Sequence, residues 1–111
     1  MRLLQYGARI IRLVEALPKT LVCRCIGDQL LRSGTAVGAN YEEAQGVESR
    51  VDFSHKLQVA LKELRESNYW LRLLELSEKM PRDRLADIID ESTQLRAILS
   101  KAVATTKANL K

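Results

Sequence analysis

Apolar residues recur along this chain at alternating steps of three and four, which is the period of an amphipathic helix. Four segments carry the pattern, and the sequence predicts a helix in each, at about residues 3–16, 19–45, 50–78 and 82–109. The apolar stripes of the first three are Leu3, Gly7, Ile10, Val14 and Leu17; Val22, Ile26, Leu30, Ser33, Val37, Tyr41 and Ala44; and Phe53, Leu57, Ala60, Leu64, Ser67, Leu71 and Leu74. Because apolar and polar residues rarely alternate over the length of a strand, we expect an all-α fold.

The second segment contains a stretch that can also be interpreted as a loop. Ser33-Gly34 and Gly38 are residues that often mark turns. Since Gly34 and Gly38 are four apart, a helix would place them on one face, where small residues let a neighbouring helix approach closely. We therefore expect one continuous helix of about 27 residues, roughly 40 Å long, in which packing offsets a propensity cost of about 1 kcal/mol per glycine.

The connections between the four segments are short. Pro18 is expected in the first turn of the second helix, Gly46 as a C-terminal cap, and Ser49 as an N-cap with Asp52 three residues later. Short connections make successive helices antiparallel neighbours, so we expect one domain over residues 1–111, an antiparallel up-down-up-down four-helix bundle. The first helix is the shortest and should leave apolar surface uncovered, from which we infer self-association.

The expected location is cytoplasmic. No apolar run approaches the ~18 residues of a membrane-spanning helix, and Arg9 and Arg12 come too early for a signal peptide. Cys23 and Cys25 would point about 200° apart on a helix, so they cannot bridge to each other there and should stay reduced. We take the source to be bacterial.

The residue types needed for an enzyme or a metal centre are scarce. His55 is the single histidine and there is no CxxC motif, so we expect no catalytic residue, no metal, no cofactor and no small-molecule substrate. A di-iron site in a bundle would need Glu-x-x-His on two helices. We expect the acids to form salt bridges with Lys56, Lys62 and Arg65 instead; these acids are Glu42, Glu43, Asp52, Glu63 and Glu66.

The charge distribution points to an anionic partner. The chain has 18 Lys and Arg against 14 Asp and Glu, a formal net charge of +4, and no acid from residue 92 onward. The expected topology places the start of the first helix and the end of the fourth at the same end of the bundle, which would concentrate the excess charge there. The candidate nucleic-acid-binding residues are Arg2, Arg9, Arg12, Arg96, Lys101, Lys107 and Lys111. Alternatively, cations near a helix C-terminus only complement the helix dipole and aid solubility. Most of the few aromatic residues look like core, so a base-stacking platform is not expected.

Three motifs carry a family resemblance: RSGTAVGANYEEA at residues 32–44, SRVDF at 49–53 and KELRESNYWL at 62–71. They closely resemble the four-helix-bundle family named for proteins encoded in intervening sequences of bacterial 23S rRNA genes. That family also contains the accessory variability determinants of diversity-generating retroelements. The resemblance covers essentially the whole chain. It implies a bundle that assembles as a ring, typically a homopentamer, with residues 33–40 helical and without known catalysis.

The resemblance also suggests partners. Accessory variability determinants bind nucleic acid and a reverse transcriptase through basic surfaces, although the positions of those basic residues are not part of the motifs. The leading hypothesis is a non-enzymatic oligomeric module that binds RNA, DNA or a nucleoprotein partner such as a reverse transcriptase. The alternative is a structural or protein-interaction scaffold with no nucleic-acid role.

Overall fold

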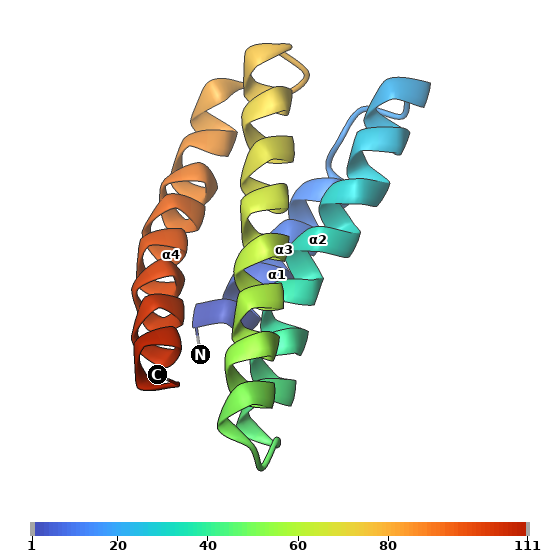
Figure 1. Cartoon of the computed structure of the whole chain (residues 1–111). Coiled ribbons are helices and arrows are strands. Elements are labelled where there is room, and N and C mark those ends of the chain that lie inside the picture. Colours follow the sequence, from blue (N-terminus) through green and yellow to red (C-terminus); the bar gives the residue numbers. More distant parts are fainter. Residues whose placement is uncertain (1, 111) are drawn as a thin grey trace.

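The computed structural model describes residues 2–110, and these residues form four α-helices joined by short connections, without a β-strand. The helices are α1 (Arg2–Glu15), α2 (Leu21–Gln45), α3 (Arg50–Leu76) and α4 (Arg82–Asn109). Their extents lie within a few residues of the predicted ones, which confirms the all-α fold. The helices pack into a body of 47 × 21 × 20 Å. Figure 1 shows the α2–α3 connection at the bottom of this body and the α3–α4 connection at the top.

The start of α3 follows the predicted capping pattern. The Ser49 side chain accepts a hydrogen bond of 3.0 Å from the backbone N–H of Asp52, which satisfies one of the unpaired donors of the first turn. Gly46 caps α2 as predicted, but with φ of −97° it does not use the left-handed conformation that glycine permits. That conformation occurs after α3 instead, at Glu78, where φ is 58°.

The predicted role of Pro18 is wrong. The helix α2 begins at Leu21, and Pro18 lies in the connection before it. Thr20 is the N-cap, with its hydroxyl accepting a 3.2 Å hydrogen bond from the backbone N–H of Cys23. A threonine side chain that can satisfy a helix donor is a better N-terminus than a proline two residues earlier.

Helix α2 is continuous through its glycines, as predicted. The helix α1 lies directly against them: a Cβ atom added at Gly34 would come within 2.8 Å of Cγ1 and Cγ2 of Ile10. At Gly38 the nearest atom would be the carbonyl oxygen of Leu3, at 3.4 Å. The absence of a side chain therefore lets the two helices approach closely, most tightly at Gly34.

The buried stripes of α1 and of the first turns of α2 differ from the predicted ones, whereas the predicted stripe of α2 is correct at Leu30, Ser33, Val37 and Ala44. In α1 the buried residues include Tyr6 and Leu13 in place of Leu3 and Val14. In α2, Cys23 is buried while Val22 is 50% exposed. In α3 the predicted stripe is correct from Leu57 to Leu74.

The core contains one group of buried polar side chains, which we call the polar layer: Tyr6, Ser67, Asn68 and Ser92, each at most 3% exposed. The Ser67 hydroxyl donates to the Leu64 carbonyl at 2.9 Å, so in its 2.8 Å contact with Tyr6 the phenol is the donor. Asn68 donates to the Ser92 hydroxyl at 2.6 Å. Burial raises the pKa of Tyr6 to about 12, against smaller lowering effects of Ser67 and Ser92. These bonds join α1, α3 and α4.

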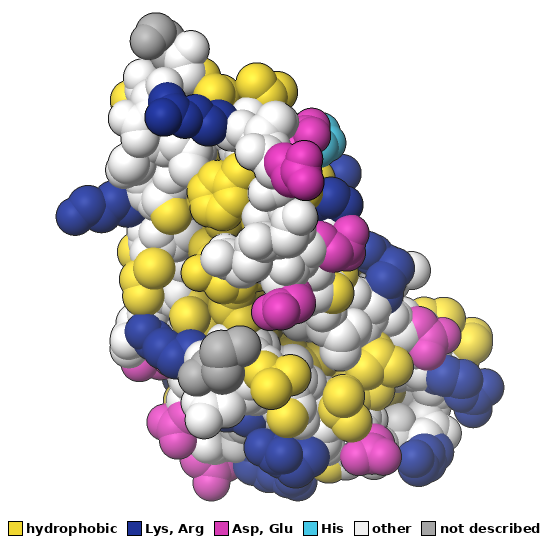
Figure 2. Space-filling model, turned by 90° about the horizontal axis from the view of Figure 1, so that it is seen from below, with side chains coloured by type: hydrophobic (Ala, Val, Ile, Leu, Met, Phe, Trp, Pro, Cys, Tyr) yellow, Lys and Arg dark blue, Asp and Glu magenta, His cyan; other side chains and the backbone are white. Residues whose placement is uncertain are grey.

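One end of the bundle is built by three helices, because α1 is short. The first turn of α1 reaches α2 at Gly38 and α4 at Glu91, and below it a groove of about 390 Å³ remains. We call it the open groove; it is lined by Tyr41, Phe53, Leu57, Ile98, Lys101, Ala102, Thr105 and Thr106. Figure 2, which shows this end of the molecule, has hydrophobic side chains in the middle of the face. None of the described helices is both long and apolar enough to cross a membrane.

Candidate nucleic-acid interface

The first of the predicted basic residues is engaged within the bundle. The guanidinium of Arg2 donates to both carboxylate oxygens of Glu91, at 2.6 and 3.2 Å. Hydrogen bonding to Arg2 lowers the pKa of Glu91, so this acid stays charged near neutral pH. Arg9 also acts electrostatically on Glu91, whereas Arg12 is exposed in the last turn of α1. The charge of Arg2 therefore contributes to the contact between α1 and α4.

The start of α1 and the end of α4 both lie in the lower part of the body in Figure 1, as expected, but they are not level with each other. Arg2 contacts Glu91 and Gln94, in the first half of α4. From Gln94 to Lys107 the helix axis runs about 20 Å further. The cause is the length of α1, which spans only part of α4. Figure 2 shows Lys and Arg side chains spread around the edge of this end, with Asp and Glu between them.

The predicted residues of α4 belong to different surfaces. Lys101 and Lys107 are exposed, and Lys101 lines the open groove. Arg96 is half-buried and lines a separate groove. Lys111 lies outside the described residues. The structure thus brings Lys101 and Lys107 to one region of α4 and places Arg2 and Arg96 elsewhere.

The groove that contains Arg96 lies between α3 and α4 and measures about 650 Å³. We call it the arginine groove; its lining is Arg65, Asn68, Tyr69, Arg72, Leu73, Glu75, Leu76 and Arg96. Among residues 2–110 the ion pairs within 4.0 Å involve Arg2, Arg32, Lys56 and Arg82, so none of the three arginines of this groove forms one, although Glu75 lines the same groove. The Glu75 carboxylate lies 4.0 Å from Arg82. The arginine groove is therefore a place where cations face solvent without internal partners.

Sequence reasoning missed Arg65, Tyr69 and Arg72. It assigned most aromatic residues to the core, yet Tyr69 is 58% exposed. The signal was available in the spacing: steps of four and three place these residues on one face of α3, beside the buried stripe. Leu76 continues that face and is 83% exposed.

The acidic residues form ion pairs, although with other partners than most of those predicted. Lys56 binds Glu43 at 2.8 Å, as expected. Arg32, and not Lys62 or Arg65, binds both Glu63 and Glu66. The Trp70 indole donates to Glu66 at 3.0 Å, and this bond, followed by that of Arg32, lowers the pKa of Glu66.

The residue types of a metal centre do not gather. Cys23 is buried and Cys25 is exposed, and both are free thiols. Within residues 2–110 no three His, Cys, Asp or Glu side chains lie close enough together to hold a metal ion.

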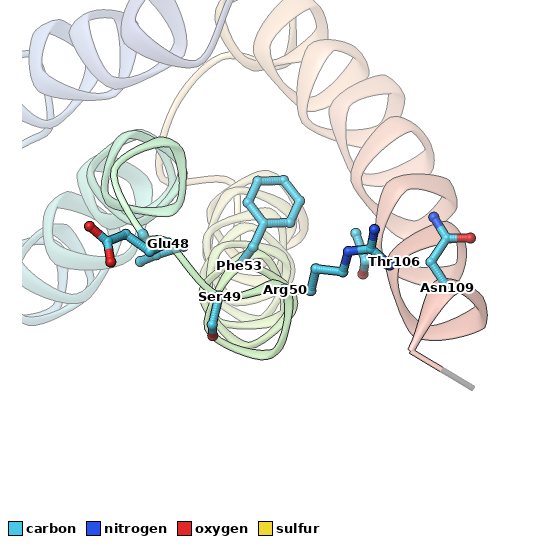
Figure 3. A pocket seen from close by; sticks show the side chains of 7 residues that line it. Glu48, Ser49, Arg50, Phe53, Thr106 and Asn109 are labelled. Carbon is cyan, nitrogen blue, oxygen red and sulfur yellow. The ribbon is translucent and has the colours of Figure 1, made fainter.

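A pocket of about 610 Å³ extends the open groove to the end of the bundle. Figure 3 shows Phe53 pointing into the space between the helices and Arg50 extending from α3 toward Thr106 of α4. Glu48 and Ser49 point away from it. The two depressions share Phe53 and Thr106, so apolar surface and cations lie together at the end that α1 leaves uncovered.

Comparison with known proteins gives the family. The family model described as 23S rRNA-intervening sequence protein matches residues 2–101. The chain belongs to this family. It is 37% identical to a protein of known crystal structure from Bacteroides thetaiotaomicron, described as a protein with unknown function from the S23 ribosomal protein family. The alignment covers 92% of this chain and 94% of the other, with a TM-score of 0.84. No curated protein matches the chain. The resemblance seen in the sequence motifs is thereby confirmed at the level of this family.

Proposed function

We propose that this member of the 23S rRNA-intervening sequence family is a non-enzymatic cytoplasmic module that binds nucleic acid, or a nucleoprotein such as a reverse-transcriptase complex, through basic surfaces. The observation that carries the proposal is the set of three arginines in the arginine groove, none of which forms an ion pair within 4.0 Å. Three arginines against one acid, Glu75, give the groove an excess of positive charge, which attracts an anionic partner. The exposed Lys101 and Lys107 provide a second basic surface.

We also propose that the module is an up-down-up-down bundle that assembles into a homo-oligomer, with five copies as the resemblance to the family implies. The open groove supports self-association, because Ile98 is 52% exposed beside the half-buried Tyr41 and Phe53. A single copy offers few phosphate contacts. A ring multiplies them and raises affinity by avidity.

Fluorescence anisotropy with mixed-sequence DNA and RNA tests the binding. Affinity should be similar for all sequences and should fall steeply with salt, because counterion release dominates. Replacing Lys101, Lys107 and Lys111 with Gln should weaken binding to every sequence alike and flatten the salt dependence without unfolding the bundle. Absence of binding even at low salt would contradict the proposal.

The assembly has its own test. Light scattering of the purified protein at micromolar concentration should give the mass of a closed homo-oligomer. A stable monomer mass would refute it.

The second candidate is a scaffold that binds protein only. The spread of cations in Figure 2 and the internal pairing of Arg2 favour it. The same anisotropy experiment separates the two functions, since a scaffold leaves both probes free.

A further inference from the structure

The arginine groove contains an aromatic ring that the bundle holds in place but does not cover. The Tyr69 ring meets the Trp70 ring edge-on, with centroids 5.1 Å apart and an interplanar angle of 77°. Trp70 is half-buried, and its indole donates to Glu66, which Arg32 also binds. Tyr69 nevertheless stays 58% exposed. A tyrosine supported on one side has little side-chain freedom left to lose when a flat ligand stacks on it.

Three arginines and one acid, Glu75, line the groove around this ring. Arg65 and Arg72 precede and follow Tyr69 on the same face of α3, about 10 Å apart along the helix axis, and Arg96 faces them from α4. A guanidinium presents its donors in a planar fork that matches phosphate oxygens. The apolar part of the groove is Leu73 and the largely exposed Leu76. The groove therefore combines a stacking surface with several phosphate-binding groups.

We propose that the arginine groove binds a short single-stranded segment of nucleic acid, with one base stacked on Tyr69 and the flanking phosphates on Arg65, Arg72 and Arg96. This inference rests on the proposed nucleic-acid function and names the form of nucleic acid and the site. An intact duplex keeps its base faces inside the stack and offers the tyrosine none of them. A single strand exposes both base faces and phosphates, which is the combination that stacking platforms recognise.

The experiment uses the full chain and fluorescein-labelled strands of about 12 nucleotides, a length within the span of single-stranded sites. The single strand and the duplex of the same sequence are titrated at about 50 mM salt, where phosphate contacts are strong. The single strand should bind more tightly. Tyr69→Ala should weaken its binding by roughly fivefold to a hundredfold, the range expected when one base can no longer stack. Tyr69→Phe keeps the ring and should bind like the parent.

The arginines are tested with a charge-matched control. Replacing Arg65, Arg72 and Arg96 with Gln should weaken binding and reduce the slope of log affinity against log salt by about 0.7 for each phosphate that the protein no longer neutralises. Replacing Lys19, Arg24 and Arg84 with Gln removes the same charge from exposed positions outside the groove, and should leave most of the affinity. Trp70 is the single tryptophan, so its emission should change when a base stacks beside it. Far-UV circular dichroism checks that each variant is folded.

The outcomes separate the two proposals. If neither probe binds the parent protein, the nucleic-acid function itself fails. If the parent binds but the duplex is preferred, or Tyr69→Ala binds as tightly as the parent, the site assignment is overturned while the function stands. Displacement of the strand by polyglutamate as efficiently as by unlabelled strand would show a site for acidic protein, and would also overturn it.

Discussion

Two glycines of α2 allow the close approach of α1 to be tested by Gly→Ala substitutions, each of which adds one methyl group facing α1. Gly34→Ala and Gly38→Ala lie four residues apart on the same helix and gain the same helix propensity, about 1 kcal/mol. Only their surroundings differ. At Gly34 the new Cβ would lie 2.8 Å from both Cγ atoms of Ile10, whereas at Gly38 its nearest neighbour would be 3.4 Å away, an ordinary contact.

The clash at Gly34 cannot be relieved cheaply. Ile10 is 0% exposed, and its branched Cβ restricts rotation about χ1. Overpacking of this kind costs about 1–3 kcal/mol, which cancels or exceeds the propensity gain. We therefore expect Gly38→Ala to stabilise the protein by up to about 1 kcal/mol. Gly34→Ala should have a free energy of unfolding about 1–3 kcal/mol below that of Gly38→Ala.

Urea titration followed by circular dichroism measures the difference, at one protein concentration because self-association shifts apparent stability. A double-mutant cycle supplies the control. Ile10→Ala removes both clashing Cγ atoms and should itself cost about 2–5 kcal/mol. In that background Gly34→Ala should become neutral or stabilising. Equal stability of the two glycine variants in the parent background would refute the close approach of α1.

Three further outcomes are expected. Tyr6→Phe should lower the free energy of unfolding by about 0.5–1.5 kcal/mol in urea titration at neutral pH. Because the pKa of Tyr6 is about 12 when folded and 10.0 normally, the unfolded chain loses this proton first as the pH rises, so the parent should lose stability between these values and the variant less. Ser49→Ala should cost about 1 kcal/mol in the same titration because the N-cap is removed, and Ser49→Thr much less. The pKa values of Glu66 and Glu91 lie below the usual 4.5. The two carboxylates therefore contribute to folding stability above that pH, and this contribution is lost as the pH falls through their folded pKa values. The thermal midpoint of Glu66→Gln should accordingly fall less on acidification than that of the parent.

The helices were predictable because their signal is local. The three- and four-residue period and the Ser49 cap lie within single segments of sequence. The phase of α1 was not predictable in this way. Tyr6 looks like a boundary residue until its hydroxyl meets Ser67, which is 61 positions away. The helical period places Gly7 in the predicted apolar stripe of α1. Because glycine has no side chain to bury, its role there depends on how close the backbone of α2 comes.

The candidate site needed long-range information for a similar reason. Arg2 and Glu91 are 89 positions apart, so their pairing has no signature in sequence. The predicted cluster of cations also assumed that α1 extends as far along the bundle as α4. Because α1 is shorter, this assumption fails. Arg65, Tyr69 and Arg72 were different, because their shared helix face could have been recognised from their spacing alone.

The polar layer has a consequence for how the helices align. An interface made only of leucines allows one helix to shift along its neighbour, because different apolar contacts have similar energies. A slide of α1 by one turn, about 5.4 Å, would move the Tyr6 hydroxyl away from Ser67 and leave it among apolar side chains. Each buried polar group left without a partner costs about 1–3 kcal/mol. Asn68 and Ser92 impose the same condition on α3 and α4. The polar layer therefore selects one alignment of α1, α3 and α4 among several that the apolar side chains would accept.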